Sequence, residues 1–130
     1  CDFVYTTNAT RFGDTHTKFG LRPTWGMSQT LSRAVGQRRA RELSFTAKTF
    51  NGAQAVVWGI ANESFETVEA LDDALAATCA QIIANSTEAV AAMKDLYRLA
   101  EREEGVRASL ESELGLEYKI SDTAERLSKF

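Results

Sequence analysis

The hydrophobic pattern of the first 65 residues predicts short extended segments that alternate with loops and short helices. Residues 2–6 consist mainly of side chains that favour strands, and Asn8 follows them as a turn residue. Residues 11–26 place glycine and proline among polar side chains, which predicts an irregular loop. Loops of this kind often carry functional groups, so we expect the candidate chemistry here.

Glycines divide the next part of the chain into short helices. We expect a helix that Ser28 caps and that Gly36 ends, because glycine adopts the left-handed conformation at a helix end without steric cost. A second helix is expected over residues 37–45. Residues 52–58 predict a further short helix, and residues 60–61 an extended segment.

From residue 67 onward the pattern becomes helical. Apolar side chains recur at spacings of three and four and define one stripe of a first helix. This stripe consists of Val68, Leu71, Leu75, Thr78, Cys79, Ile82 and Ile83. After Asn85 and Ser86 a second helix is expected, with Met93 and Tyr97 on one face. We interpret these two side chains as core or interface residues and not as cofactor ligands.

Composition narrows the class of protein. A chain of 130 residues suits one domain, and 44% hydrophobic with 25% charged residues is ordinary for a globular protein. A formal net charge of -3 argues against binding to nucleic acid phosphate. Cys1 and Cys79 suggest neither a disulfide framework nor a metal site, and the single histidine disfavours zinc. With no apolar run of the roughly 18 residues that span a membrane, we expect a cytoplasmic protein.

Several separated motifs occur in an order and spacing that chance rarely produces. The central ones are RFGDTH at residues 11–16, GLRPTWG at residues 20–26 and LSRAVG at residues 31–36. Further anchors are Cys1, Asp2, Ala53, Ala55, Gly59, residues 60–62, residues 85–94, Asp122, Glu125 and Phe130. Over essentially the whole chain these motifs resemble the crotonase superfamily, the enoyl-CoA hydratase/isomerase group.

The resemblance implies an α/β protein, the C-terminal part of a crotonase (ClpP/crotonase-like) fold. Residues 1–65 would form the last part of the core, with short strands and helices, and residues 66–130 a helical cap that builds homotrimers or hexamers. The resemblance places the upstream strands, the two oxyanion-hole amides and the first catalytic glutamate before Cys1. We therefore expect the C-terminal half of a longer protein, inactive by itself.

The implied reaction adds water to an enoyl-CoA thioester or moves its double bond. Family hydratases use two glutamates for the proton transfers, and the second of them lies in a short motif such as Gln-Pro-Glu. At the matching positions this chain has Asp14, Thr15 and His16. A neutral imidazole accepts one proton and donates another near pH 7, so His16 is the candidate catalytic residue. Asp14 could orient it if the segment is extended. The alternative is that His16 is a polar loop residue whose side chain forms a hydrogen bond with the backbone.

The resemblance also implies a substrate-binding set, which consists of Thr15, Pro23, Thr24 and Trp25. Thr24 stands where the family usually has glycine, and Trp25 replaces a small residue. Trp25 either narrows the acyl pocket or packs in the core, and we favour packing slightly because large aromatic side chains are usually buried. A coenzyme A thioester is the expected substrate, and no metal or redox cofactor is expected.

Two alternatives stay open at this point. The altered position at His16 would also suit a non-catalytic acyl-CoA-binding module, and the helical stripes would suit an oligomerisation module. A basic cluster, Arg38, Arg39 and Arg41, is interpreted as a solvated helix face, with a contact to an acyl-CoA phosphate as the less favoured reading.

Overall fold

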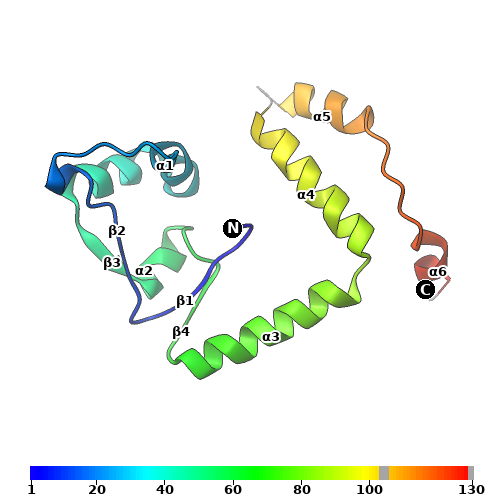
Figure 1. The fold of residues 1–130 in the computed structure, drawn as a ribbon, viewed down its shortest axis with the longest axis horizontal. Coiled ribbons are helices and arrows are strands. Elements are labelled where there is room, and N and C mark those ends of the chain that lie inside the picture. The colour runs from blue at the N-terminus through cyan, green and yellow to red at the C-terminus, as the bar shows by residue number, and fades with distance from the viewer. Residues whose placement is uncertain (103–105, 129–130) are drawn as a thin grey trace. The chain divides into compact units, whose positions relative to one another are not determined.

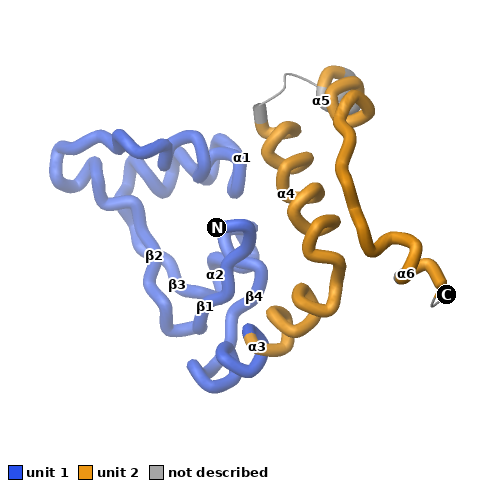
Figure 2. Tube along the Cα trace, turned by 45° about the vertical axis from the view of Figure 1, so that its right-hand side comes forward, with its two compact units in different colours: residues 1–75 blue, residues 76–130 orange. Residues whose placement is uncertain are grey.

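The computed structural model describes residues 1–102 and 106–128 of the chain (Figure 1). Contacts within the chain define two compact units, residues 1–75 and residues 76–130, which Figure 2 colours blue and orange. The boundary between them falls inside helix α3 (Val68–Ala84). The boundary predicted from the sequence, where the helical pattern begins to dominate, lies somewhat earlier, between residues 65 and 66.

Unit 1 contains one pair of short parallel strands, which come from its N-terminal segment and from the segment just before α3. Strand β1 (Tyr5–Thr7) pairs with β4 (Glu63–Phe65), so that segments almost 60 residues apart in the sequence lie side by side (Figure 1). The predicted first strand exists but starts later than expected. The turn at Asn8 follows it as predicted, with the backbone N–H of Thr10 donating to the carbonyl of Thr7 at 3.0 Å.

A second strand pair lies where the sequence pattern predicts none. Strand β2 (Arg11–Gly13) pairs antiparallel with β3 (Thr49–Asn51), and Phe12 faces Phe50 across the pair. The prediction of an irregular loop over residues 11–26 is therefore wrong for its first three residues and for the short 3-10 helix η1 (Thr17–Phe19). Three-residue strands carry almost no local signal, because the pairing depends on a partner far away in the sequence.

Helix α1 (Met27–Thr46) changes direction at Gly36, as the sequence predicts. Gly36 has φ 74° and ψ 159°, a conformation that side chains other than glycine rarely adopt, and it divides α1 into two helical segments. The predicted cap at Ser28 is wrong. The helix begins two residues earlier than that cap implies, at Met27, and its N-cap is Gly26 with φ 86°.

Helix α2 (Gly52–Val57) confirms the short helix expected after residue 51. Its first turn has a capping box, in which Asn51 accepts from the backbone N–H of Gln54 at 2.9 Å and the Gln54 side chain accepts from Asn51 N–H at 3.0 Å. The predicted extended segment at residues 60–61 is wrong. The backbone N–H groups of both residues donate to the carbonyl of Ala55, which makes a turn after α2.

A small apolar core holds unit 1 together. Its buried members are Leu43, Phe50, Ala55 and Ala61. Leu43 has no exposed surface, and the rings of Phe12 and Phe50 stack with centroids 5.5 Å apart. The core therefore joins the second segment of α1 to β3 and α2.

Unit 2 consists of helices joined by polar contacts. Beyond α3 it contains α4 (Thr87–Arg102), α5 (Val106–Leu114) and α6 (Thr123–Leu127). The Ser86 hydroxyl bonds to Asp122, and the Ser121 hydroxyl donates to Glu88 at 2.8 Å. These contacts hold the segment that follows α5 against the start of α4.

The apolar stripes predicted on the late helices exist, but they are not buried within this chain. No residue of α3 is buried, and Met93 and Tyr97 on α4 are 48% and 67% exposed. The two α4 side chains are therefore not core residues here, and their interpretation as interface residues stays a prediction. Phe130, part of the resemblance, lies outside the described residues. No helix in residues 1–102 and 106–128 has the length and apolar character needed to cross a membrane.

Candidate active site

A cavity of about 430 Å³ lies between the core of unit 1 and the loop that follows β2. Most of its lining is apolar and comes from β2, the first part of α1, β3 and the turn after α2. The apolar lining includes Phe12, Trp25, Met27, Leu31, Phe50 and Ile60. Polar groups enter mainly from Asp14, Thr15 and His16 on one side. An apolar hollow with a few convergent polar groups is the usual form of a small-molecule site.

Asp14 and His16 form a close pair at this polar side. The Nδ1 atom of His16 lies 2.7 Å from Oδ1 of Asp14, and the backbone N–H of His16 donates to the same oxygen at 3.2 Å. This arrangement is an Asx turn and not the extended segment that we considered from the sequence. The predicted orientation of His16 by Asp14 is confirmed, but a turn brings the two side chains together.

Burial of Asp14 raises the pKa of its carboxyl group, but hydrogen bonds from the His16 imidazole, the Ser44 hydroxyl and the His16 backbone outweigh that effect. The pKa of Asp14 is therefore below its ordinary value. With 6% of its side chain exposed, Asp14 is an ionised carboxylate shielded from water. Such a group fixes the tautomer of its histidine, because Nδ1 must carry the proton that it donates.

The lowered pKa of Asp14 predicts a dependence of stability on pH. The ionised carboxylate stabilises the folded chain above its unfolded pKa, about 3.8, and this contribution is lost as the pH falls through the lower folded-state value. The free energy of unfolding should therefore fall more steeply in acid for the wild type than for Asp14→Asn. Urea denaturation between about pH 2 and pH 6 measures both slopes. Equal slopes would contradict the assignment.

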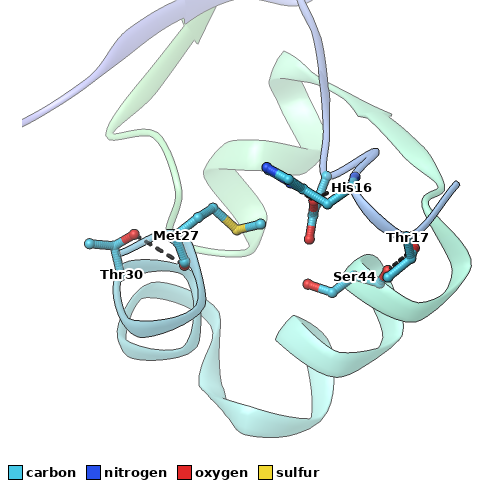
Figure 3. Close-up of polar contacts among 6 residues, drawn as sticks. His16, Thr17, Met27, Thr30 and Ser44 are labelled. Atoms are coloured by element: carbon cyan, nitrogen blue, oxygen red, sulfur yellow. Dashed lines mark hydrogen bonds and ion pairs between the residues drawn. The ribbon is translucent and has the colours of Figure 1, made fainter. Parts of the chain in front are cut away.

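The other ring nitrogen of His16 is available to the cavity. With Nδ1 engaged by Asp14, Nε2 of the neutral imidazole has a lone pair that accepts a proton. Figure 3 shows the His16 side chain extending from its loop toward the space that Met27 approaches from the first turn of α1. His16 is 23% exposed, so a bound molecule can reach it. The arrangement suits proton transfer to and from an apolar substrate.

The other residues predicted to bind substrate fall into two groups. Thr15 and Trp25 line the cavity with His16, whereas Pro23 and Thr24 are not among the lining residues. Trp25 is 69% exposed and its ring centroid lies 6.0 Å from that of His16. The interpretation of Trp25 as a buried packing residue is therefore wrong within this chain. The side chain instead forms one edge of the cavity.

Sequence reasoning missed the opposite walls of the cavity. Met27 and Phe50 line it but lie in none of the motifs, and Phe12 lies in the RFGDTH motif but was not among the residues predicted to bind substrate. Nothing in the sequence distinguished these three residues from other apolar residues. They become cavity residues because β2 pairs with β3 and because α1 begins directly after Gly26.

The basic cluster on α1 lies away from this cavity. The guanidinium of Arg39 packs 4.4 Å from the Trp58 ring centroid and 3.9 Å from the Glu42 carboxylate. Arg38 and Arg41 are exposed. These positions favour the interpretation of the cluster as a solvated helix face. Across residues 1–102 and 106–128, no group of three or more potential ligand side chains is arranged to hold a metal ion.

Comparison with known families gives a match over nearly the whole chain. The family model described as "Enoyl-CoA hydratase/isomerase" matches residues 1–128. The Arabidopsis thaliana protein named "Probable enoyl-CoA hydratase 1, peroxisomal" is 40% identical over 74 residues, which cover 57% of this chain and 28% of that protein. The "Short-chain-enoyl-CoA hydratase" of Clostridioides difficile is 29% identical over 133 residues, 100% of this chain and 84% of that protein.

Solved structures give the same result. The crystal structure of a Thermobifida fusca protein in complex with acetoacetyl-CoA superimposes with a TM-score of 0.79 at 27% identity. The similarity covers 100% of this chain and 48% of the Thermobifida fusca chain. The chain thus spans about half the length of this relative of known structure, and less than a third of the Arabidopsis thaliana protein.

Proposed function

The chain belongs to the enoyl-CoA hydratase/isomerase family, and we propose on this premise that the whole protein hydrates an enoyl-CoA thioester or isomerises its double bond. The observation that carries the proposal is the Asp14–His16 pair at the edge of an apolar cavity. In this proposal the cavity receives the acyl group. His16 moves a proton between water and the reacting carbons.

The chemistry of the reaction fits these groups. Adding water to a double bond conjugated to a thioester requires a group that alternately accepts and donates a proton, and an imidazole does so near neutral pH. The Asp14 carboxylate stabilises the imidazolium that forms when Nε2 takes up a proton. The same carboxylate keeps the ring in one orientation, so each transfer starts from the same geometry.

The reaction also places negative charge on the thioester oxygen. Hydrogen-bond donors must stabilise that charge, and in this family backbone amides supply them. The resemblance assigns these amides, and the first glutamate, to positions outside residues 1–128. Residues 1–65 would therefore contribute one proton-transfer group and part of the acyl pocket to a larger site. The acetoacetyl-CoA bound to the Thermobifida fusca protein supports an acyl-CoA thioester as the substrate.

Turnover of crotonyl-CoA by the whole protein tests this function. We expect loss of the conjugated double bond and formation of a hydroxyacyl-CoA, or a shifted double bond with a longer enoyl-CoA. Isothermal titration calorimetry with a saturated acyl-CoA measures binding separately. Binding without turnover would support the alternative, an acyl-CoA-binding module in which histidine has replaced the carboxylate of the family.

We further propose that the helices α3 and α4 mediate assembly into homotrimers or hexamers. Both helices present large apolar side chains that nothing in residues 1–102 and 106–128 covers fully. These are Val68, Leu75, Ile82 and Ile83 on α3 and Val90, Met93 and Tyr97 on α4. Apolar side chains exposed to this extent on successive helices are typical of interfaces between subunits.

A charge placed on this surface should weaken the assembly. Ile83 is 78% exposed, and in Ile83→Glu a carboxylate would have to leave water when subunits associate. We expect the dissociation constant of the oligomer to rise by about two orders of magnitude. Sedimentation velocity at several concentrations measures it. Gln81→Glu adds the same charge at an exposed residue of α3, and an equal effect of both variants would argue against an apolar interface at Ile83.

The same proposal includes the compartment of the cell in which the protein acts. A cytoplasmic protein of fatty acid metabolism is what the sequence predicts. The Arabidopsis thaliana relative is named as peroxisomal, so microscopy of the tagged whole protein should include a peroxisomal marker. Localisation to that compartment would overturn the cytoplasmic prediction.

A further inference from the structure

The walls of the cavity differ in how firmly their side chains are held. Leu43 and Phe50 form an inner wall that belongs to the core of unit 1, with 0% and 6% of their surface exposed. The Phe50 ring contacts two further rings, with its centroid 5.5 Å from that of Phe12 and 5.0 Å from that of Trp58. Close-packed core side chains do not move aside without strain. The inner wall therefore does not widen for a larger ligand.

Met27 forms a wall of a different kind. It lines the cavity from the first turn of α1 and is half-buried. Figure 3 shows its thioether extending from the helix into the space beside the His16 ring. A methionine side chain is unbranched and flexible, but turning it out of the cavity would expose its apolar surface to water. The side chain therefore stays across the cavity unless a ligand displaces it.

The backbone that carries Met27 is held in place. The carbonyl of Gly26, the N-cap of α1, accepts from the N–H groups of Gln29 and Thr30, both at 3.0 Å. The Thr30 hydroxyl also donates to the Met27 carbonyl at 3.2 Å (Figure 3). These contacts fix the point from which the thioether enters the cavity. The size of the side chain at this position then decides how much room remains for a ligand.

We propose that Met27 limits the length of the acyl chain that the site accepts, and that the preferred substrates are short-chain enoyl-CoA thioesters. The inference rests on the proposed function, in which His16 faces the reacting carbons. An acyl chain that lies beside Nε2 of His16 and continues into the cavity meets the inner wall and Met27. Since the inner wall does not yield, a long chain has to displace the Met27 side chain into water.

The volume of the cavity supports the same substrate class. It is about 430 Å³, toward the lower end of the roughly 300–1,000 Å³ that is usual for small-molecule sites. Its apolar lining suits the hydrocarbon part of an acyl group, and its polar groups lie mainly on the His16 side. A short acyl group therefore fills the space beside His16 without disturbing Met27.

The substitution Met27→Ala isolates this role. It removes the side-chain atoms beyond Cβ and leaves room for about three further carbons of an acyl chain. We expect the wild type to bind butyryl-CoA more tightly than decanoyl-CoA. In Met27→Ala the ratio of the two dissociation constants should move toward decanoyl-CoA by about tenfold or more.

Two further substitutions keep the test independent of a single variant. Met27→Leu nearly conserves the volume of the side chain and should keep the wild-type ratio within about threefold. Met27→Phe places a larger and stiffer side chain in the cavity and should move the ratio further toward butyryl-CoA. Gln29→Ala is the matched control, because Gln29 is an exposed residue of the same helical turn that is not among the lining residues. It should bind both thioesters as the wild type does.

Isothermal titration calorimetry of the whole protein with butyryl-CoA and decanoyl-CoA measures these ratios. Both thioesters lack the double bond, so the preference is measured without turnover. The ratio of kcat/KM for crotonyl-CoA and decenoyl-CoA should change in the same direction. If both thioesters bind but Met27→Ala has the wild-type ratio, the inference is overturned while the proposed function stands. Tighter binding of decanoyl-CoA by the wild type would also overturn it. If neither thioester binds to the wild type, the proposed function fails as well.

Discussion

Replacing His16 by alanine in the whole protein should lower kcat for crotonyl-CoA by about 10²- to 10⁴-fold, the usual contribution of a positioned acid or base. The reason is that, within the described part of the site, the imidazole of His16 is the kind of group that takes up and releases a proton near pH 7. KM should change little, because Trp25, Phe12 and the other apolar walls of the cavity remain in place. Steady-state kinetics of the two proteins measures both constants.

A second variant separates proton transfer from simple contact. His16→Gln keeps a polar side chain of similar size that can bond to Asp14, but it has no titratable nitrogen. We expect His16→Gln to be as slow as His16→Ala. If the glutamine variant retained more than about a tenth of the wild-type kcat, His16 would be a binding residue and not the proton-transfer group.

The largest effect on stability is expected from Gly52→Ala. Gly52 is buried at the start of α2, and a Cβ atom there would lie 1.9 Å from the carbonyl oxygen of Thr7 on β1. Since that atom belongs to the backbone of a paired strand, it cannot move aside without disturbing the contact of β1 with β4. We expect a loss of about 3 kcal/mol or more in the free energy of unfolding. Urea denaturation of the chain measures it.

Gly115→Ala is the matched control for this prediction. A Cβ at Gly115 would meet its nearest neighbour, the carbonyl of Glu111, at 3.5 Å, which is ordinary van der Waals contact. This variant should unfold within about 0.5 kcal/mol of the wild type. If Gly52→Ala had the same urea midpoint as Gly115→Ala, the close approach of α2 to β1 would be contradicted.

Helices and their glycine boundaries could be predicted from the sequence because their signals are local. Gly36 interrupts α1 and the apolar stripe after Thr67 becomes α3, both as expected. The expected α/β class and crotonase-like fold are confirmed by the family match and by the structural similarity to the Thermobifida fusca protein. Strands β2 and β3 were missed, because their pairing depends on two segments about 40 residues apart.

The candidate site was predicted in part. Thr15, His16 and Trp25 share one cavity as expected. Asp14 contacts His16 because an aspartate side chain can accept a hydrogen bond from the backbone N–H two residues further along the chain, which forms a turn. Met27 and Phe50 could not be predicted as cavity residues, since they line the cavity only after α1 begins at Met27 and β3 pairs with β2. Trp25 was misjudged because the burial usual for tryptophan does not apply at the edge of an open cavity.

The most direct test of proton transfer by His16 is the incorporation of deuterium from D2O into the acyl group of a bound thioester. The whole protein is incubated with 3-hydroxybutyryl-CoA, and mass spectrometry follows the mass of the acyl group with time. We predict incorporation by the wild type and a rate at least about 100-fold lower for His16→Ala. Equal rates for the two proteins would contradict the assignment of His16 as the group that moves the proton.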